Sequence, residues 1–245
     1  MSYRLGVDIG GTFTDFVVYD EASGELHAWK NLSTPADPSE GVMTGLRTFG
    51  KQSEISGIRL GTTVATNALL EGKGARVAYV TTAGFRDIPF IMRGDRKHHY
   101  DLGWIKPKPF LKRRDAYEVS ERVGPSGEIL SPLNEDEVRA VAKKIAAEPE
   151  IGAVAVMTMH SYLTPDHEQR IKQIFAEEAP DLPVSISYEV LPKWKEHFRS
   201  STTICDAFIK PVVKDRIGSM KSRLEAEGVD ARLVVMRSNG GEMEA

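Results

Sequence analysis

Two apolar runs near the amino terminus enclose a pair of glycines, and this arrangement limits the fold more than any other stretch of the chain. Residues 5–7 and 16–19 have the composition of β-strands, so the residues between them predict a turn that joins two strands. We expect Gly10 and Gly11 to adopt positive φ in that turn and to let a ligand approach the backbone closely. Successive N–H groups in such a turn form a concave site for anionic oxygens.

Polar residues on both sides of the glycines favour a phosphate site. Thr12 and Thr14 offer hydroxyl donors, and Asp8, at the end of the first strand, is placed to hold a hydrated Mg²⁺. The alternative is an ordinary Gly-Gly hairpin that binds nothing, but the acids at Asp8 and Asp15 favour a ligand. We expect Asp8, Thr12 and Thr14 to be catalytic and Asp8 to bind the metal. The expected phosphate-binding residues are Gly10, Gly11, Thr12, Phe13 and Thr14.

The pattern Asp8-x-Gly10-Gly11-Thr12-x-Thr14-Asp15 resembles the first phosphate loop of the actin-like ATPase superfamily. Its Thr-Phe-Thr-Asp version resembles the hydantoinase A/5-oxoprolinase family within that superfamily. The resemblance implies an α/β fold, an actin-like (ribonuclease H-like) lobe with a mixed twisted sheet and flanking helices, and it implies ATP and Mg²⁺ as cofactors. The predicted order of three strands, a helix starting at Asp37-Pro38 and a further strand agrees with such a lobe.

A second candidate segment begins at Gly61, where a short strand is expected to turn into a helix. Free N–H groups at the start of that helix would suit an anion, although the threonines there equally suit simple helix capping. The segment is nearly identical to a signature of hydantoinase A-like proteins, and this resemblance places Thr62, Thr63 and Asn67 near the active cleft.

The last informative stretch is a buried strand that runs into Ser238, Asn239, Gly240 and Gly241, which we also expect to bind the cofactor. It resembles the start of the second lobe of the family. We therefore expect a first lobe over residues 1–190 and a truncated start of the hydantoinase A-type domain over residues 191–245. Since no second phosphate loop follows, we expect no turnover by these 245 residues alone.

Other polar residues carry weaker expectations. Metal binding by His98 and His99 is disfavoured, since adjacent residues of an extended segment face opposite ways. His160 follows a buried strand and is expected to have a hydrogen-bonded structural role. Glu196, Arg199 and Thr202 lie at spacings of three, on one face of a helix, where a Glu-Arg pair is usually solvated; a site contact there rests on the resemblance.

Composition excludes several classes of function. A net charge of -3 leaves no basic footprint for nucleic acid, and no apolar run approaches the length of a membrane span. One cysteine, Cys205, cannot form an internal disulfide, and no leader is recognised at the amino terminus. We expect a cytoplasmic protein.

The resemblance implies an ATP-dependent amidohydrolase subunit of hydantoinase/5-oxoprolinase type, which phosphorylates a cyclic amide or imide carbonyl before ring opening. It implies a hydantoinase B-like subunit or domain as partner, hence a hetero-oligomer. An ATP-dependent ketone carboxylase subunit, of acetone or acetophenone type, is the alternative. A non-catalytic actin-like nucleotide-binding lobe is the second alternative.

Overall fold

The computed structural model describes residues 2–34, 37–94 and 100–245, and these divide into two compact units. Unit 1 comprises residues 1–67 and 212–245, and unit 2 comprises residues 68–211. One helix, α7 (Glu196–Ala226), contributes its first part to unit 2 and its second part to unit 1. It runs through Pro211 as one helix, although a proline inside a helix usually kinks or ends it.

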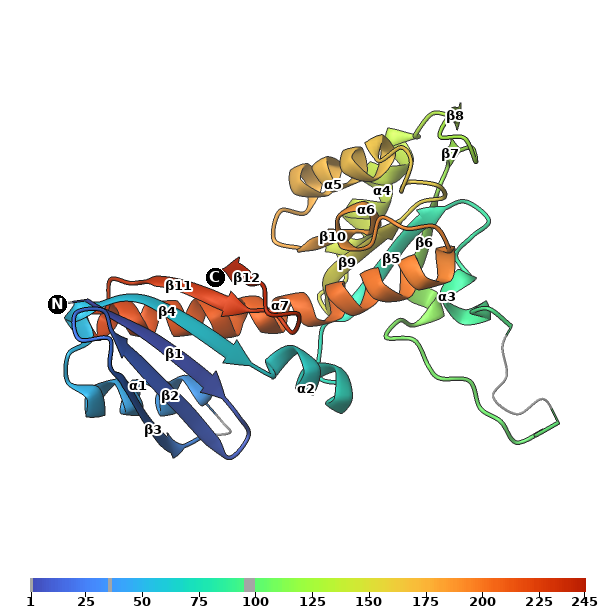
Figure 1. Ribbon diagram of the computed structural model, residues 1–245. Coiled ribbons are helices and arrows are strands. Elements are labelled where there is room, and N and C mark those ends of the chain that lie inside the picture. The colour runs from blue at the N-terminus through green and yellow to red at the C-terminus, as the bar shows by residue number, and fades with distance from the viewer. Residues whose placement is uncertain (1, 35–36, 95–99) are drawn as a thin grey trace. The chain divides into compact units, whose positions relative to one another are not determined.

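Unit 1 contains a mixed sheet in the order β12-β11-β4-β1-β2-β3 (Figure 1). Its strands are β1 (Tyr3–Ile9), β2 (Phe13–Asp20), β3 (Leu26–Leu32), β4 (Ile55–Thr62), β11 (Arg232–Met236) and β12 (Glu242–Glu244). The chain makes an antiparallel meander from β1 to β3, then β4 pairs parallel with β1, and β11 pairs parallel with β4. A short 3-10 helix (Gln52–Glu54) precedes β4.

Alternation along the strands buries one face of this sheet. Leu5, Val7 and Phe16 pack there against α1 (Pro38–Phe49) and the second part of α7. Asp37 caps α1 as predicted, because its side chain accepts a hydrogen bond from the Ser39 N–H at 3.2 Å and Pro38 follows it. The opposite face carries the exposed residues of β1 and β2, including Asp8 and Asp15.

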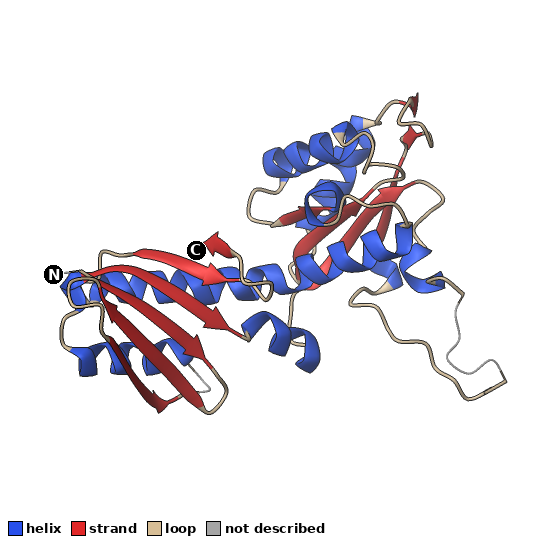
Figure 2. Cartoon of the chain, viewed as in Figure 1, coloured by secondary structure: helices blue, strands red, loops and turns tan. Residues whose placement is uncertain are grey.

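Unit 2 has three layers around a parallel sheet in the order β10-β9-β5-β6 (Figure 2). Helices α4 and α5 bury one face of the sheet, and the first part of α7 buries the other. The parallel strands are β5 (Arg76–Thr82), β6 (Ala116–Val119), β9 (Ile151–Met157) and β10 (Val184–Ile186). The helices are α2 (Val64–Glu71), α3 (Ile88–Ile91), α4 (Glu135–Ala146), α5 (Asp166–Glu178) and α6 (Ser187–Val190), with a 3-10 helix at Arg113–Asp115. Helix α2 begins in unit 1 and ends in unit 2.

Residues 116–123 and 128–130 flank a turn with two glycines and a proline, a pattern typical of one hairpin, but in the structure they separate. β6 joins the parallel sheet, and only β7 (Arg122–Val123) and β8 (Ile129–Ser131) form an antiparallel pair. The fold class is confirmed, since a mixed twisted sheet with flanking helices forms unit 1 in the order expected for an actin-like lobe. Among the described residues, no helix combines the length and the apolar character that crossing a bilayer requires.

Candidate functional site

The turn between β1 and β2 needs a glycine for a reason that the sequence did not reveal. Neither Gly10 nor Gly11 has positive φ, contrary to the expectation. The Gly10 N–H donates to the Phe13 carbonyl at 3.0 Å, and a Cβ on Gly10 would lie 2.9 Å from that same oxygen. A Cβ on Gly11 would meet no atom within 4 Å. Close backbone approach, at Gly10 alone, is therefore the steric requirement.

Ser33 stabilises this turn by donating hydrogen bonds to two of the turn's carbonyl groups. Its hydroxyl donates to the Gly10 carbonyl at 2.8 Å, and its N–H donates to the Thr12 carbonyl at 2.8 Å. Within the described part of the chain, the N–H groups of Gly11 and Thr12 meet no acceptor. Their peptide donors thus stay open at an exposed turn, which is the property that an anion site requires.

The two threonines of the turn differ in orientation because strand residues alternate in direction. Thr12 is exposed, as a ligand donor must be. Thr14 is fully buried, and its hydroxyl lies 2.9 Å from the Ser33 hydroxyl. Thr14 was expected to offer its hydroxyl to phosphate; in the structure, that hydroxyl is inside the unit and supports the turn through Ser33.

Asp8 lies on the open face of the sheet beside two positions that bear on its role. Asp15 is its directly opposed partner on β2, and both carboxylates are exposed. Gly61 is its neighbour on β4, where a Cβ would lie 2.9 Å from the Asp8 Oδ1. Opposed like charges destabilise a strand pair, so a cation between Asp8 and Asp15 would be favourable. Gly61 also leaves the Asp8 carboxylate the space it occupies.

The segment after β4 uses its polar groups within its own helix start. The Thr62 hydroxyl accepts from the Val64 N–H at 3.3 Å, and the Asn67 side-chain amide donates to the Thr63 hydroxyl at 3.3 Å. These contacts are those of helix capping, the alternative that the residues themselves allowed. Gly61 lies inside β4 and not at a bend between strand and helix.

The turn after β11 contains the last four expected binding residues. Gly240 adopts positive φ of 82°, and its N–H donates to the Arg237 carbonyl at 2.9 Å. The Gly241 N–H donates to the Asn239 side chain at 3.0 Å, and Ser238 is exposed. This Gly-Gly turn was predicted, and here a glycine is required by its φ.

Strand pairing brings the three segments to one edge of the unit 1 sheet. Ile9 at the end of β1 pairs with Thr62 at the end of β4, and Leu60 pairs with Val235 near the end of β11. Because β1, β4 and β11 are parallel, the segments that follow them share the carboxyl edge, where ligands bind in open α/β sheets. The expected site residues, although distant in sequence, therefore converge.

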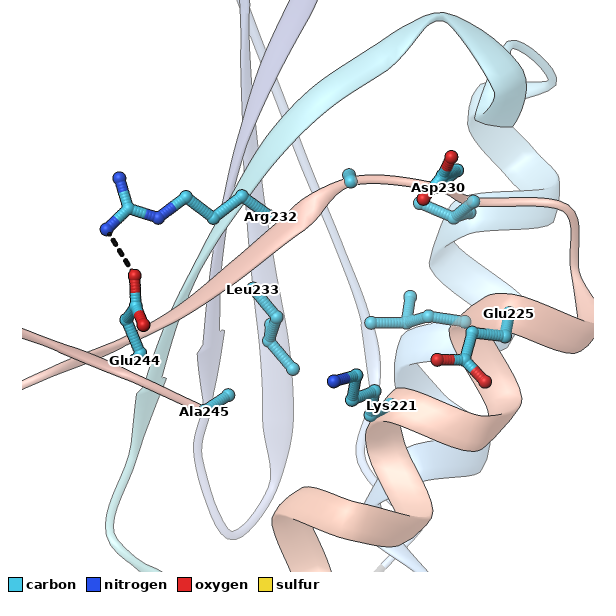
Figure 3. A pocket seen from close by; sticks show the side chains of 10 residues that line it. Lys221, Glu225, Asp230, Arg232, Leu233, Glu244 and Ala245 are labelled. Atoms are coloured by element: carbon cyan, nitrogen blue, oxygen red, sulfur yellow. Dashed lines mark hydrogen bonds and ion pairs between the residues drawn. The ribbon is translucent and has the colours of Figure 1, made fainter.

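Two cavities of unit 1 lie at opposite edges of this sheet. One, of about 260 Å³, lies at the carboxyl edge and is lined by Ile9, Thr62 and Ser238 among mainly apolar neighbours. The other, of about 400 Å³, lies at the amino end of β11, where Arg232 and Glu244 pair at 2.8 Å (Figure 3). The first is lined by residues from the ends of β1, β4 and β11, but not by Gly11 or Thr12, whose N–H groups are open.

The residues at the carboxyl edge fit a polyphosphate and a divalent cation. The open space beside Gly11 and the open N–H groups of Gly11 and Thr12 suit phosphate oxygens. The exposed carboxylates of Asp8 and Asp15 supply the oxygen ligands that Mg²⁺ prefers, directly or through water.

Unit 2 contains a buried charge pair that sequence reasoning missed. Arg199 is buried instead of solvated, and its guanidinium donates to the Thr158 carbonyl and, at 2.6 Å, to the Ser161 hydroxyl. It lies 4.0 Å from Glu168, which is also buried. Burial raises the pKa of the Glu168 carboxyl. In the sequence, Arg199 was grouped with Glu196, which is half-buried, and with Thr202, which is exposed. That spacing did not indicate that Arg199 pairs with Glu168.

The structure describes one of the three histidines for which the sequence gave an expectation. His160 has the structural hydrogen bond that was expected, with its Nδ1 2.9 Å from the Val123 carbonyl oxygen. His98 and His99 lie outside the described residues. No group of three His, Cys, Asp or Glu side chains that could hold a metal ion occurs in the part of the chain that the structure describes.

Comparison with known proteins assigns the chain to a family. The model of the hydantoinase/oxoprolinase N-terminal region matches residues 4–179, and the hydantoinase/oxoprolinase model matches residues 199–245. An uncharacterised protein of Methanocaldococcus jannaschii is 38% identical over 98% of this chain and 36% of its own length. The acetophenone carboxylase gamma subunit of Aromatoleum aromaticum is 31% identical over 98% of this chain and 35% of its own.

The crystal structure of an ATP-dependent caprolactamase from Pseudomonas jessenii is similar with a TM-score of 0.85 and 31% identity, over 98% of this chain and 36% of that chain. The chain thus spans about a third of the length of the relatives it matches. Because the family model covers residues 4–179 and the sheet order agrees with an actin-like lobe, the chain belongs to the hydantoinase/oxoprolinase family.

Proposed function

We propose that the chain is the ATP-binding part of an ATP- and Mg²⁺-dependent hydrolase that opens a cyclic amide or imide. The convergence of three segments at the carboxyl edge of unit 1, with open N–H donors at Gly11 and Thr12, is the observation that carries the proposal. The family and its caprolactamase relative support the reaction class. When bound, ATP supplies the phosphoryl group that activates the amide carbonyl oxygen.

The chain's own residues would bind and orient the nucleotide. The Gly11 and Thr12 N–H groups and the Thr12 hydroxyl would donate to phosphate oxygens, and Gly11 would let them approach the backbone closely. Gly10 would keep the turn in the conformation that presents these donors. Asp8 would hold the hydrated Mg²⁺, opposed by Asp15. Such fixed donors stabilise the charge that develops during phosphoryl transfer. Thr14 would act indirectly, through Ser33. Thr62, Thr63, Asn67 and residues 238–241 would line the same site.

A hetero-oligomer with a hydantoinase B-like subunit or domain completes the proposal, and the relative designated a gamma subunit supports it. The same relative supports one competing reaction, the carboxylation of a ketone activated by ATP. The two reactions share the nucleotide site and differ in the substrate and in the nucleophile that attacks it. We also propose the domain division at residue 190, which lies between the two family matches but does not coincide with the limits of the compact units.

Isothermal titration of the chain with Mg-ATP tests the nucleotide site. We expect saturable binding that Asp8→Ala weakens at least about tenfold, because one charge-stabilising contact is typically worth that much or more. Glu25→Gln removes an exposed acid from the turn between β2 and β3, at the other end of β2, and serves as the matched control. Binding that is equal in the wild type and in Asp8→Ala would remove Asp8 from the site. Tight binding without turnover in the assembled protein would favour a non-catalytic lobe.

A further inference from the structure

The parallel sheet of unit 2 has a point at which its connections change direction. From β5 the chain continues to β6 on one side, and from β9 it continues to β10 on the other, although β5 and β9 are neighbours. Ligands of open α/β sheets bind outside the carboxyl ends of the two strands at such a point. No residue of the proposed ATP site lies in this part of the chain.

A groove of about 540 Å³ lies at that point. Phe85 and Ile88 follow the carboxyl end of β5, and Met159 follows that of β9. We call this the β5–β9 groove. The residues used to define it are Phe85, Ile88, Met92, Arg93, Met159 and Lys195. Its volume is within the range of sites for small organic molecules.

The groove combines an apolar wall with cationic groups. Four of its defining residues are apolar, while Arg93 and Lys195 are cationic. The guanidinium of Arg122 stands 4.8 Å from the ring centre of Phe85, which brings a third cation to the same wall. Glu196 is the acid that lines the groove. Among the described residues that line the groove, two cations and one acid accompany the apolar surface.

The backbone around the groove is held in a costly conformation. Of the described non-glycine residues, Met92, His160 and Lys195 have positive φ, of 61°, 58° and 78°. Met92 and Lys195 line the groove, and His160 directly follows Met159. Residues other than glycine rarely adopt positive φ, and those that do are frequent at functional sites, where the surrounding structure holds them in this conformation. The coincidence of all three at one sheet edge points to a built site.

Buried contacts hold the cationic side of the groove in place. The Arg199 N–H donates to the Lys195 carbonyl at 3.2 Å, and the Arg199 guanidinium donates to the Thr158 carbonyl, next to Met159. The Lys195 Nζ lies 4.6 Å from the ring centre of Trp194 and 5.7 Å from that of Phe198. The start of α7 is thus tied to the end of β9, and the Lys195 ammonium is positioned by aromatic rings.

We propose that the β5–β9 groove binds a small organic carboxylate with an apolar body, whose charged end contacts Lys195 and Arg93. The proposal does not depend on nucleotide binding. Hydrolysis of a cyclic amide also releases a carboxylate, and only this link rests on the proposed function.

Calorimetric titration of the chain with hexanoate, without nucleotide, tests the proposal. We expect saturable binding with a Kd on the order of 1 mM or lower, as suits a ligand of this size. Hexylamine has a similar body and the opposite charge, and ε-caprolactam is similar and neutral, so both are expected to bind at least about tenfold more weakly. Absence of saturable hexanoate binding overturns the proposal, as does equal binding of hexylamine or ε-caprolactam.

Two variants of one residue separate the charge from the fold. Lys195→Met removes the cation. Lys195→Gly also removes it, and glycine adopts the φ of 78° at this position without strain. Both should weaken hexanoate binding at least about tenfold, while Lys195→Gly should unfold at a temperature no lower than the wild type. Lys193→Met, at an exposed lysine, should bind as the wild type does. Undiminished binding by Lys195→Gly would overturn the assignment, while Mg-ATP binding stays a separate readout for the proposed function.

Discussion

Gly10 and Gly11 are adjacent and chemically identical, yet only one of them is constrained by its surroundings. The Phe13 carbonyl lies where a side chain on Gly10 would begin, whereas Gly11 faces open space. The pair therefore separates the part of the turn that needs close packing from the part that a ligand would approach.

Alanine at each position tests this difference. Gly10→Ala should lower the free energy of unfolding by about 1–3 kcal/mol, because the Phe13 carbonyl must move to admit the methyl group. It should weaken Mg-ATP binding as well, since the donors of the turn move with it. Gly11→Ala should change the stability by less than about 0.5 kcal/mol. Urea denaturation followed by circular dichroism measures both, and equal losses would contradict the steric explanation.

Sequence patterns indicated which residues of the turn and its neighbours matter, but not which contacts make them necessary. The chain shows Gly10 as a turn residue, but its contact with Phe13 depends on the backbone path through the turn. Gly61 was expected to turn the chain from strand to helix, but it lies within β4. Its neighbour Asp8, across the sheet, is distant in sequence and could not be recognised from the local pattern. Thr14 was expected to face a ligand, and one position in strand alternation decides that it faces Ser33.

Helix α7 shows at the scale of an element how a buried charge is satisfied. Arg199 enters the interior of unit 2 from this helix and contacts Thr158, Ser161, Ser187 and Glu168. Glu168 in turn accepts from the Thr158 N–H at 2.9 Å and the Tyr188 N–H at 2.8 Å. The network joins α5, α7 and the segments after β9 and β10, so each member restrains several elements.

Arg199→Met should destabilise the chain by about 3–5 kcal/mol at pH 7, because it leaves the Glu168 carboxylate buried without a cation. Burial raises the pKa of Glu168 above its unfolded value. A raised folded-state pKa means that the protonated form stabilises the fold, and this contribution is lost as the pH rises through that pKa. The deficit of Arg199→Met should therefore shrink as the pH falls from 7 towards 5.

Urea denaturation at several pH values measures this dependence. The double variant Arg199→Met/Glu168→Gln should regain part of the lost stability at pH 7, since it carries no unpaired charge. A deficit that grows as the pH falls, or a double variant no more stable than Arg199→Met, would contradict the role given to Glu168.

Element boundaries with local signals were predicted from the sequence. Asp37 caps α1 as expected, and Asn134 caps α4 by a similar contact, since its side chain accepts from the Glu137 N–H at 3.2 Å. Predictions that needed a distant partner were less successful. The adjacent residues Arg86 and Asp87 each pair with a residue distant in sequence, Asp87 with Arg113 at 2.7 Å and Arg86 with Glu118 at 3.7 Å.

At the scale of the whole molecule, each unit has a core of its own. The buried cluster of unit 1 contains residues from two segments, one from Tyr3 to Leu60 and the other from Met220 to Leu233. The clusters on the two faces of the unit 2 sheet draw on residues between Val77 and Phe208. The cluster of unit 1 shares no residue with the clusters of unit 2. The division could not be predicted from sequence patterns, because the pairing of β11 with β4 spans residues 68–211.

Gly45→Ala should destabilise unit 1 selectively. A Cβ there would lie 2.1 Å from the Phe16 ring, which is fully buried and stacks on Trp29. We expect a loss of about 1–3 kcal/mol, and hydrogen exchange followed by mass spectrometry should show faster exchange in residues 3–62 than in β5 and β9. Gly218→Ala, also in a helix of unit 1 but with no atom within 4 Å, is the matched control and should not destabilise. Equal acceleration in both units would show that they unfold together.

The discontinuity of unit 1 has a consequence for biosynthesis. Strands β1 to β4 leave the ribosome before β11, which pairs with β4 and is made only after all of residues 68–211. Until then the free edge of β4 has unpaired peptide groups, a state that invites association with other nascent chains. Early folding of unit 2 would shorten the distance that the late strand must search, and chaperone demand should be greatest while unit 2 is being translated.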